Sequence, residues 1–119
     1  KEMSMPKGSF FTDKDGEERS EIRIKWWENP AEMTYKSISV EPLDNLPEES
    51  IDLSELKSTD FYKKSDKPVF FGHYWLKGEP SLYKDNICCL DYSVARDGKL
   101  VAYRFDGEEK LDASKIVYV

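Results

Sequence analysis

The chain contains one histidine, His73, which directly follows Gly72 at the end of an apolar run, residues 68–71. A neutral imidazole can bind a transition metal, and it can act as a general acid or base near neutral pH. Glycine lets the backbone approach a ligand closely, and the ends of strands often carry binding and catalytic side chains. This pattern makes His73 a candidate metal ligand or catalytic residue. The alternative is a structural role in the core.

The two cysteines, Cys88 and Cys89, are adjacent in the apolar run 87–90. Side chains of successive residues in a strand point to opposite faces, so these two thiols are poorly placed to pair with each other. We predict two buried, reduced thiols, which fits a cytoplasmic protein. One histidine and two cysteines leave no spare ligands for a zinc site or a Ser-His-Asp hydrolase. Such chemistry would therefore need His73 or residues elsewhere.

Asp91 is a second candidate, because it lies within an apolar run, residues 86–93, that is typical of a strand. A buried carboxylate has to be paired or hydrogen-bonded. Its partners could be backbone amides, His73, Arg96 or Arg104, and the alternative is that it faces water at a sheet edge.

Two other patterns favour structure over chemistry. The acidic segment Asp13–Glu18 suggests a calcium loop, but an EF-hand needs Gly at its sixth position and Glu at its twelfth. Those positions hold Glu18 and Ile24 here, so a plain β-turn is predicted. The aromatic pairs 26–27 and 74–75 could stack on a base or a sugar, but a core or sheet-edge role is favoured because no basic groove accompanies them.

Composition excludes several classes of protein. The chain has 119 residues, 13.9 kDa, enough for one domain or a piece of one. Eighteen Lys and Arg stand against 24 Asp and Glu, a net charge of −6, which argues against general nucleic-acid binding. No apolar run approaches the roughly 20 residues that cross a membrane. We also expect no signal peptide, since no basic, apolar leader opens the chain.

Residues 1–67 are expected to contain an antiparallel strand pair followed by a connection. Residues 21–26 alternate apolar and polar side chains, which predicts a strand, and residues 34–40 have the composition of a second one. Further on, Asp52 or Ser50 could cap a short helix that carries two inward side chains, Leu53 and Leu56.

Residues 68–119 are expected to be mostly strand. The run 68–73 is typical of a strand buried on both faces. Asp97-Gly98 predicts a hairpin between the segments 86–93 and 100–105, and a last strand follows at 116–119. The expected fold class is α+β and β-rich, with antiparallel strands and one or two short helices. We interpret the chain as one domain or a domain fragment with three regions: a strand pair (1–45), a connection (46–67) and the C-terminal strands (68–119).

The ordered segments Pro68–Gly78, Asn86–Ser93 and Gly98–Arg104 resemble the C-terminal part of the calcineurin-like metallophosphoesterases. The likeness is greatest to the bacterial branch related to serine/threonine phosphatases and diadenosine tetraphosphatases. Residues 11–27 are similar to a segment of some bacterial members. The resemblance implies a layered αββα sandwich with two metals (Mn, Fe, Zn or Ni) at its strand ends, where they activate a water that attacks phosphorus. It also implies that His73 is a metal ligand.

The earlier motifs of that family, Asp-x-His, Gly-Asp-x-x-Asp-Arg and Gly-Asn-His-Glu, do not occur in this sequence. The resemblance therefore implies a C-terminal fragment that is inactive in isolation and whose partner is the N-terminal phosphoesterase half of the same polypeptide. Protein phosphates, dinucleoside polyphosphates and small phosphate esters stay open as substrates, and so does the oligomeric state. The alternative is a non-catalytic, acidic, β-rich binding or regulatory module.

Overall fold

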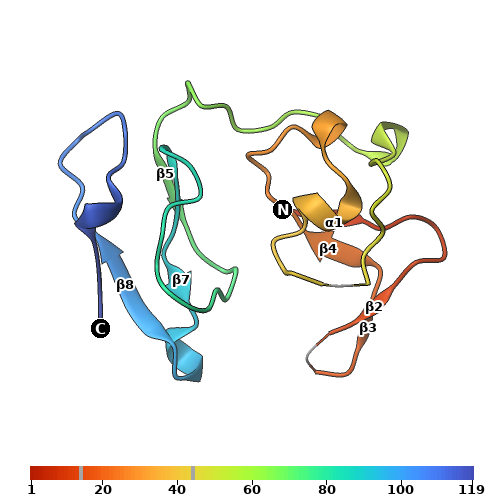
Figure 1. Ribbon diagram of the computed structural model, residues 1–119, viewed down its shortest axis with the longest axis horizontal. Coiled ribbons are helices and arrows are strands. Elements are labelled where there is room, and N and C mark those ends of the chain that lie inside the picture. The colour runs from red at the N-terminus through yellow and green to blue at the C-terminus, as the bar shows by residue number, and fades with distance from the viewer. Residues whose placement is uncertain (14, 44) are drawn as a thin grey trace. The chain divides into compact units, whose positions relative to one another are not determined.

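The computed structural model describes residues 1–13, 15–43 and 45–119, which form two compact units, 1–63 and 64–119 (Figure 1). The fold is β-rich, with small sheets that are mostly antiparallel and a few short helices, as the sequence predicted. The division between the units falls inside the region assigned to a connection from sequence, residues 46–67. None of the helices in the described residues is long and apolar enough to cross a membrane.

Four short strands in the first unit form two antiparallel pairs: β1 (Glu2–Ser4) with β4 (Glu21–Arg23), and β2 (Phe11–Thr12) with β3 (Glu18–Arg19). The register of the first pair places Met3 opposite Ile22, and both side chains are buried. The strand β1 was not predicted from the sequence, because three residues carry too little alternation to be recognised.

The predicted turn closes the β2–β3 hairpin. The Gly16 amide donates to the Asp13 carbonyl at 3.0 Å, and φ at Gly16 is +83°. The Asp13 carboxylate accepts from the Glu17 amide at 3.0 Å and from Arg19 Nε at 2.8 Å. This arginine bond is the main cause that lowers the pKa of Asp13. Asp13 is thus engaged within its own hairpin, as expected for a turn; Lys14 lies outside the described residues.

The predicted strand at 34–40 was wrong, because this segment contains the helix α1 (Tyr35–Ile38). Thr34 and Ser37 form a capping box: the Ser37 amide donates to Thr34 Oγ1 at 3.1 Å, and the Thr34 amide donates to Ser37 Oγ at 2.8 Å. Tyr35 and Ile38, three residues apart, share the buried face of the helix. Local capping therefore outweighs the strand preference of the Thr, Tyr, Ile and Val side chains.

The predicted antiparallel pairing survives only as one bridge between Ile24 and Ser39. The Val40 amide donates to the Arg23 carbonyl at 3.0 Å, directly beside this bridge. Beyond it, the 3-10 helix η1 (Pro30–Glu32) begins after Asn29, whose side chain accepts from the Ala31 amide at 3.1 Å.

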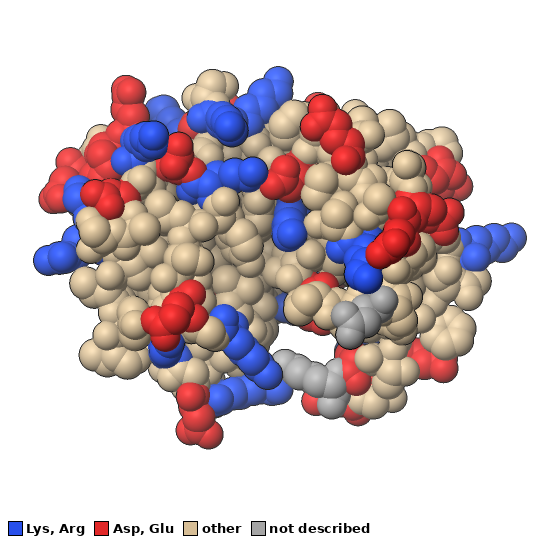
Figure 2. All heavy atoms as spheres, in the orientation of Figure 1, with Lys and Arg blue, Asp and Glu red and all other residues tan. Residues whose placement is uncertain are grey.

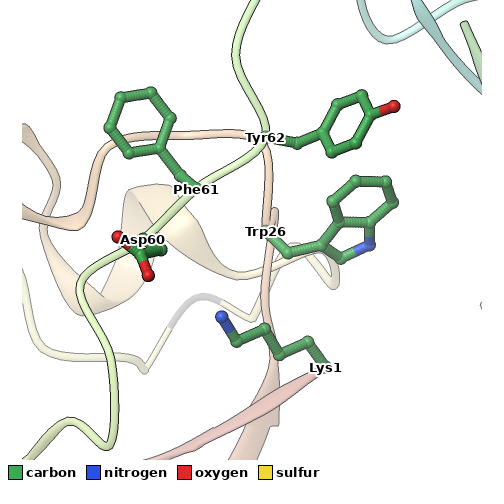
Figure 3. A pocket seen from close by; sticks show the side chains of 5 residues that line it. All are labelled: Lys1, Trp26, Asp60, Phe61 and Tyr62. Atoms are coloured by element: carbon green, nitrogen blue, oxygen red, sulfur yellow. The ribbon is translucent and has the colours of Figure 1, made fainter. Parts of the chain in front are cut away.

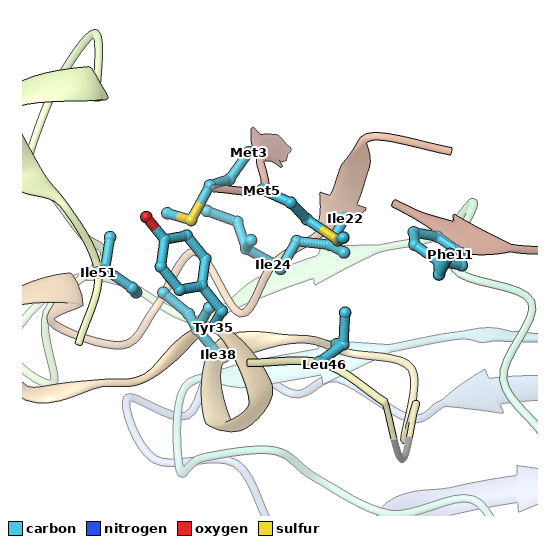
Figure 4. Packing of buried hydrophobic residues seen from close by; sticks show 9 residues of the cluster. All are labelled: Met3, Met5, Phe11, Ile22, Ile24, Tyr35, Ile38, Leu46 and Ile51. Atoms are coloured by element: carbon cyan, nitrogen blue, oxygen red, sulfur yellow. The ribbon is translucent and has the colours of Figure 1, made fainter. Parts of the chain in front are cut away.

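Nine buried hydrophobic side chains make the core of the first unit (Figure 4): Met3, Met5, Phe11, Ile22, Ile24, Tyr35, Ile38, Leu46 and Ile51. The predicted cap at Asp52 is confirmed, since its Oδ1 accepts from the Ser54 amide at 3.0 Å and the 3-10 helix η2 (Leu53–Glu55) follows. Leu56 packs against the core as expected. Leu53 was expected inside but is exposed, because η2 is a single turn that presents few residues to the core.

The second unit contains a parallel pair and an antiparallel sheet. The parallel pair joins β5 (Val69–Phe71) to β6 (Ile87–Cys89), and the sheet has the order β7 (Asp91–Tyr92), β8 (Lys99–Tyr103), β9 (Ile116–Tyr118). All three residues of β6 are buried, whereas those of β5 are half-buried, so the expectation that β5 is buried on both faces was wrong. Cys88 and Cys89 are free and buried, as predicted.

The predicted hairpin at Asp97-Gly98 is confirmed as the β7–β8 pair, in which Asp91 lies opposite Leu100. The connection is longer than a two-residue turn because it holds the 3-10 helix η3 (Val94–Arg96). A second 3-10 helix, η4 (Ala113–Lys115), precedes β9.

Candidate functional site

His73 lies just beyond the carboxyl end of β5 and is exposed. Because β5 and β6 are parallel, the residues that follow the two strands meet at one edge of the pair. An open hollow of about 450 Å³ lies at this edge, and its lining residues are Phe70, Phe71, Gly72, His73, Leu90 and Asp91. Across the described residues, no hydrogen bond or ion pair engages the His73 imidazole. Its side chain is therefore available to a ligand.

Asp91, the second candidate from sequence, bonds to backbone amides. Its Oδ2 accepts from the Trp75 amide at 3.2 Å, and its Oδ1 accepts from the Ser93 amide at 3.1 Å. Its carbonyl accepts from the Leu76 amide at 3.0 Å. Of the partners that the sequence left open, backbone amides are thus the ones realised, and Asp91 ties the loop after β5 to the start of β7.

The loop around His73 has an unusual backbone. His73 has φ of 72° and Trp75 has φ of 51°, so two residues with side chains lie in the left-handed region. This conformation costs roughly 1–2 kcal/mol for an L-residue other than glycine. The bonds to Asp91 and the bond from Ser93 Oγ to the Leu76 carbonyl, 3.0 Å long, offset that cost. No sequence pattern identified these left-handed residues.

The structure around position 72 does not require a glycine, although the sequence suggested a close backbone approach there. A Cβ built on it would meet only the Asp91 Cβ, at 3.7 Å, which is an ordinary van der Waals distance. Its φ also lies outside the left-handed range. The contacts within the described chain therefore leave room for a methyl group here.

The donor set falls short of a complete metal centre. Among the described residues, no group of three His, Cys, Asp and Glu side chains could hold a metal ion. Both carboxylate oxygens of Asp91 already accept from amides. Burial raises the pKa of Cys88 to about 11 and also raises that of Cys89, which keeps both thiols protonated and poor as ligands. The hollow at His73 thus offers one available imidazole.

The aromatic residues near His73 are structural. Tyr74 is buried, as expected for a core role, and its ring packs edge-on against Phe71 with centroids 5.1 Å apart. Trp75 is half-buried, and the Arg96 guanidinium lies 5.0 Å from the centre of its ring. This is a cation–π contact between Arg96 and the loop.

A second open hollow, of about 380 Å³, lies in the first unit (Figure 3); its lining residues are Lys1, Trp26, Asp60, Phe61 and Tyr62. The Trp26 and Tyr62 rings meet edge-on with centroids 5.6 Å apart, and the Tyr62 amide donates to the Trp26 carbonyl at 3.1 Å. Trp27, next to it, is buried. This hollow was not predicted from the sequence, where its one signal is a pair of adjacent aromatics, Phe61 and Tyr62, within a polar segment.

The negative charge is unequally divided. Residues 1–63 carry nine Lys and Arg against 15 Asp and Glu, so 9 − 15 gives −6, whereas residues 64–119 carry nine of each and are neutral. On the face seen in Figure 2, side chains of both signs are interspersed among neutral ones.

Comparison of the chain with protein-family models, with curated proteins and with solved structures found no match.

Proposed function

We propose that the chain is the C-terminal part of a metal-dependent phosphoesterase of the calcineurin-like class, in which His73 supplies one metal ligand. The observation that carries the proposal is the position of His73: an exposed imidazole without a hydrogen-bond partner among the described residues, in a hollow at the carboxyl edge of a parallel strand pair. Imidazole suits the transition metals proposed, Mn, Fe, Zn or Ni.

The remaining ligands come from the N-terminal half of the same polypeptide, because the described residues around His73 hold too few donors. Once bound there, the metals would activate a water for attack on a phosphate ester. In this proposal the chain contributes the imidazole, the loop that holds it and strands of a larger αββα sandwich. The substrate is a protein phosphate, a dinucleoside polyphosphate or a small phosphate ester. The buried, reduced thiols fit a cytoplasmic location.

The test compares His73→Ala with Lys110→Ala in the full-length polypeptide that contains this chain. Lys110 is a matched control, because it is exposed and its Nζ lies 3.4 Å from an Asp85 carboxylate oxygen on the surface. The measurements are bound metal and hydrolysis of p-nitrophenyl phosphate with Mn²⁺. We expect His73→Ala to lower metal affinity and turnover by on the order of 100-fold or more, and Lys110→Ala to leave both unchanged.

Two results would contradict the proposal. Full metal content and turnover in His73→Ala would remove the ligand role. Clear, His73-dependent hydrolysis by the 119-residue chain alone would show that it is not an inactive fragment.

The acidic first unit supports a second candidate, a non-catalytic module that binds a cationic partner. It carries the entire net charge of −6, and its open hollow presents the rings of Trp26, Phe61 and Tyr62. Titration of the ¹⁵N-labelled chain with an Arg-rich peptide that contains one Trp should shift the Trp26 indole N–H signal, and added salt should weaken the shift. An unchanged Trp26 signal at millimolar peptide would exclude this candidate.

A further inference from the structure

The loop 72–76, which presents His73, is held by hydrogen bonds to Asp91 and Ser93. His73 and Trp75 are both left-handed, a conformation that residues with a Cβ rarely adopt. Such a loop keeps its shape only where surrounding contacts over-determine it. The hydrogen bonds to this loop therefore decide where the His73 imidazole lies.

Asp91 provides two of these hydrogen bonds, and a third bond, from the Ser93 amide, fixes its carboxylate. Its Oδ2 accepts from the Trp75 amide at 3.2 Å, and its carbonyl accepts from the Leu76 amide at 3.0 Å. Its Oδ1 accepts from the Ser93 amide at 3.1 Å, which fixes the carboxylate itself. Ser93 also donates from Oγ to the Leu76 carbonyl at 3.0 Å. The Trp75 and Ser93 amides thus donate to the same carboxylate, one to each of its oxygens.

We propose that Asp91 is a positioning residue, whose carboxylate fixes the loop 72–76 and so holds the His73 imidazole ready for a metal. This inference rests on the proposed function, and it names the residue on which the ligand position depends. Asp91 comes two residues after β6, the partner strand of β5, and it lines the same hollow as His73. It acts through the loop amides and not as a ligand.

The bonding pattern at position 91 calls for a carboxylate. A carboxylate has two acceptor oxygens and no donor, so it can satisfy two amides that point at it from different directions. Asn has one acceptor, and its NH₂ group would face the second amide. Leu has a similar size and no acceptor. Asp91→Leu should therefore release both amides, whereas Asp91→Asn should keep one.

The first measurement uses the single histidine of the chain, whose ring signals are assigned in an NMR spectrum without further work. We expect Asp91→Leu to speed hydrogen exchange of the Trp75 and Ser93 amides by about tenfold or more, with Asp91→Asn in between. The His73 ring signals should move toward those of a flexible peptide. The β6 amides, such as that of Cys88, should stay protected. Asp85→Asn, an exposed carboxylate paired with Lys110, is the control for loss of charge.

The second measurement is the affinity of the full-length polypeptide for Co²⁺, followed by its visible absorption. We expect Asp91→Leu to weaken Co²⁺ binding by about 10- to 100-fold, Asp91→Asn to restore part of that loss, and Asp85→Asn to bind like the parent. A role in stability alone would change the unfolding transition and leave the Co²⁺ affinity of the folded protein as it was.

The two proposals fail in different ways. Unchanged His73 signals and unchanged Trp75 exchange in Asp91→Leu would overturn the positioning role. If Asp91→Leu unfolds, so that Cys88 loses protection, the test uses Asp91→Asn instead. Exchange of both the Trp75 and the Ser93 amides at the parent rate in Asp91→Asn would also overturn the positioning role. If His73→Ala keeps full Co²⁺ affinity, the proposed function fails, whatever the loop amides show.

Discussion

Gly98→Ala is the substitution that most directly tests the geometry of the second unit. A Cβ built on Gly98 would lie 1.9 Å from the Tyr92 carbonyl oxygen and 2.6 Å from the carbonyl carbon and oxygen of Ser93. Real Cβ atoms essentially never come closer than 3.0 Å to such atoms. The backbone must therefore open by at least 3.0 − 1.9 = 1.1 Å. All three neighbours are backbone atoms, so no change of rotamer can relieve the clash.

The energetic consequence follows from the bonds that this opening breaks. The Gly98 amide donates to the Ser93 carbonyl at 3.0 Å, and a shift of this size takes the bond beyond hydrogen-bonding distance. Its loss costs about 1 kcal/mol, and forcing extra atoms into a filled space costs roughly 1–3 kcal/mol. We expect Gly98→Ala to lower the free energy of unfolding of the second unit by about 2–4 kcal/mol.

Two other glycines of the same unit are matched controls. Gly72 has a φ outside the left-handed range and one neighbour at 3.7 Å, so Gly72→Ala should change the unfolding free energy by less than about 0.5 kcal/mol. Gly107 has φ of +89° and open space around it, so Gly107→Ala should cost roughly 1–2 kcal/mol from backbone strain alone.

The measurement is urea unfolding, monitored through the hydrogen exchange of the Val101 amide in β8. This amide reports on the second unit even if the two units unfold separately. The expected order of destabilisation is Gly98→Ala, then Gly107→Ala, then Gly72→Ala. If Gly98→Ala proves as stable as Gly72→Ala, the close approach of Gly98 to the Tyr92 carbonyl is refuted.

Three further predictions concern caps, the core and pH. Thr34→Ala removes a cap of α1 and should cost about 1 kcal/mol in urea unfolding, while Thr34→Ser should cost less. Ile38→Ala empties a fully buried site and should cost roughly 2–5 kcal/mol by the same measurement. A hydrogen bond from Tyr103 lowers the pKa of Glu108 from 4.5 to about 2, so its stabilisation is full above pH 4.5 and is lost as the pH falls toward 2. The urea midpoint should therefore fall more between pH 6 and pH 3 in the parent chain than in Glu108→Gln.

Turns could be predicted from the sequence because their causes lie within a few residues. Asp and Gly favour the bonds and the positive φ of tight turns, and the structure has turns where the β-turn within 13–18 and the hairpin at 97–98 were expected. The cap at Asp52 is predictable for the same reason, since its side chain bonds to an amide two residues away. Residues 34–40 show the limit of this approach, because a reciprocal cap can reverse the strand preference of every residue that it encloses.

The site could be predicted only in part. Gly72-His73 after an apolar run placed the imidazole at a strand end, and the apolar surroundings of Asp91 showed that it needs partners. The choice of those partners depends on the parallel pairing of β5 with β6, which joins residues 18 positions apart (Val69 and Ile87). Pairing over such a separation depends on tertiary contacts, which no local pattern reveals.

The parallel pair is also the feature of the fold that bears most directly on the proposed function. Parallel sheets occur almost only with both faces covered, and two such strands alone pair weakly. Here β6 is fully buried while β5 is half-buried, so one strand has the surroundings of an inner sheet strand and its neighbour does not. Under the proposed function, strands from the N-terminal half would complete this sheet at β5, next to His73. The same half would then cover β5 and supply the other metal ligands. One structural element would thus account both for the half-buried state of β5 and for the presence of a single histidine in this chain.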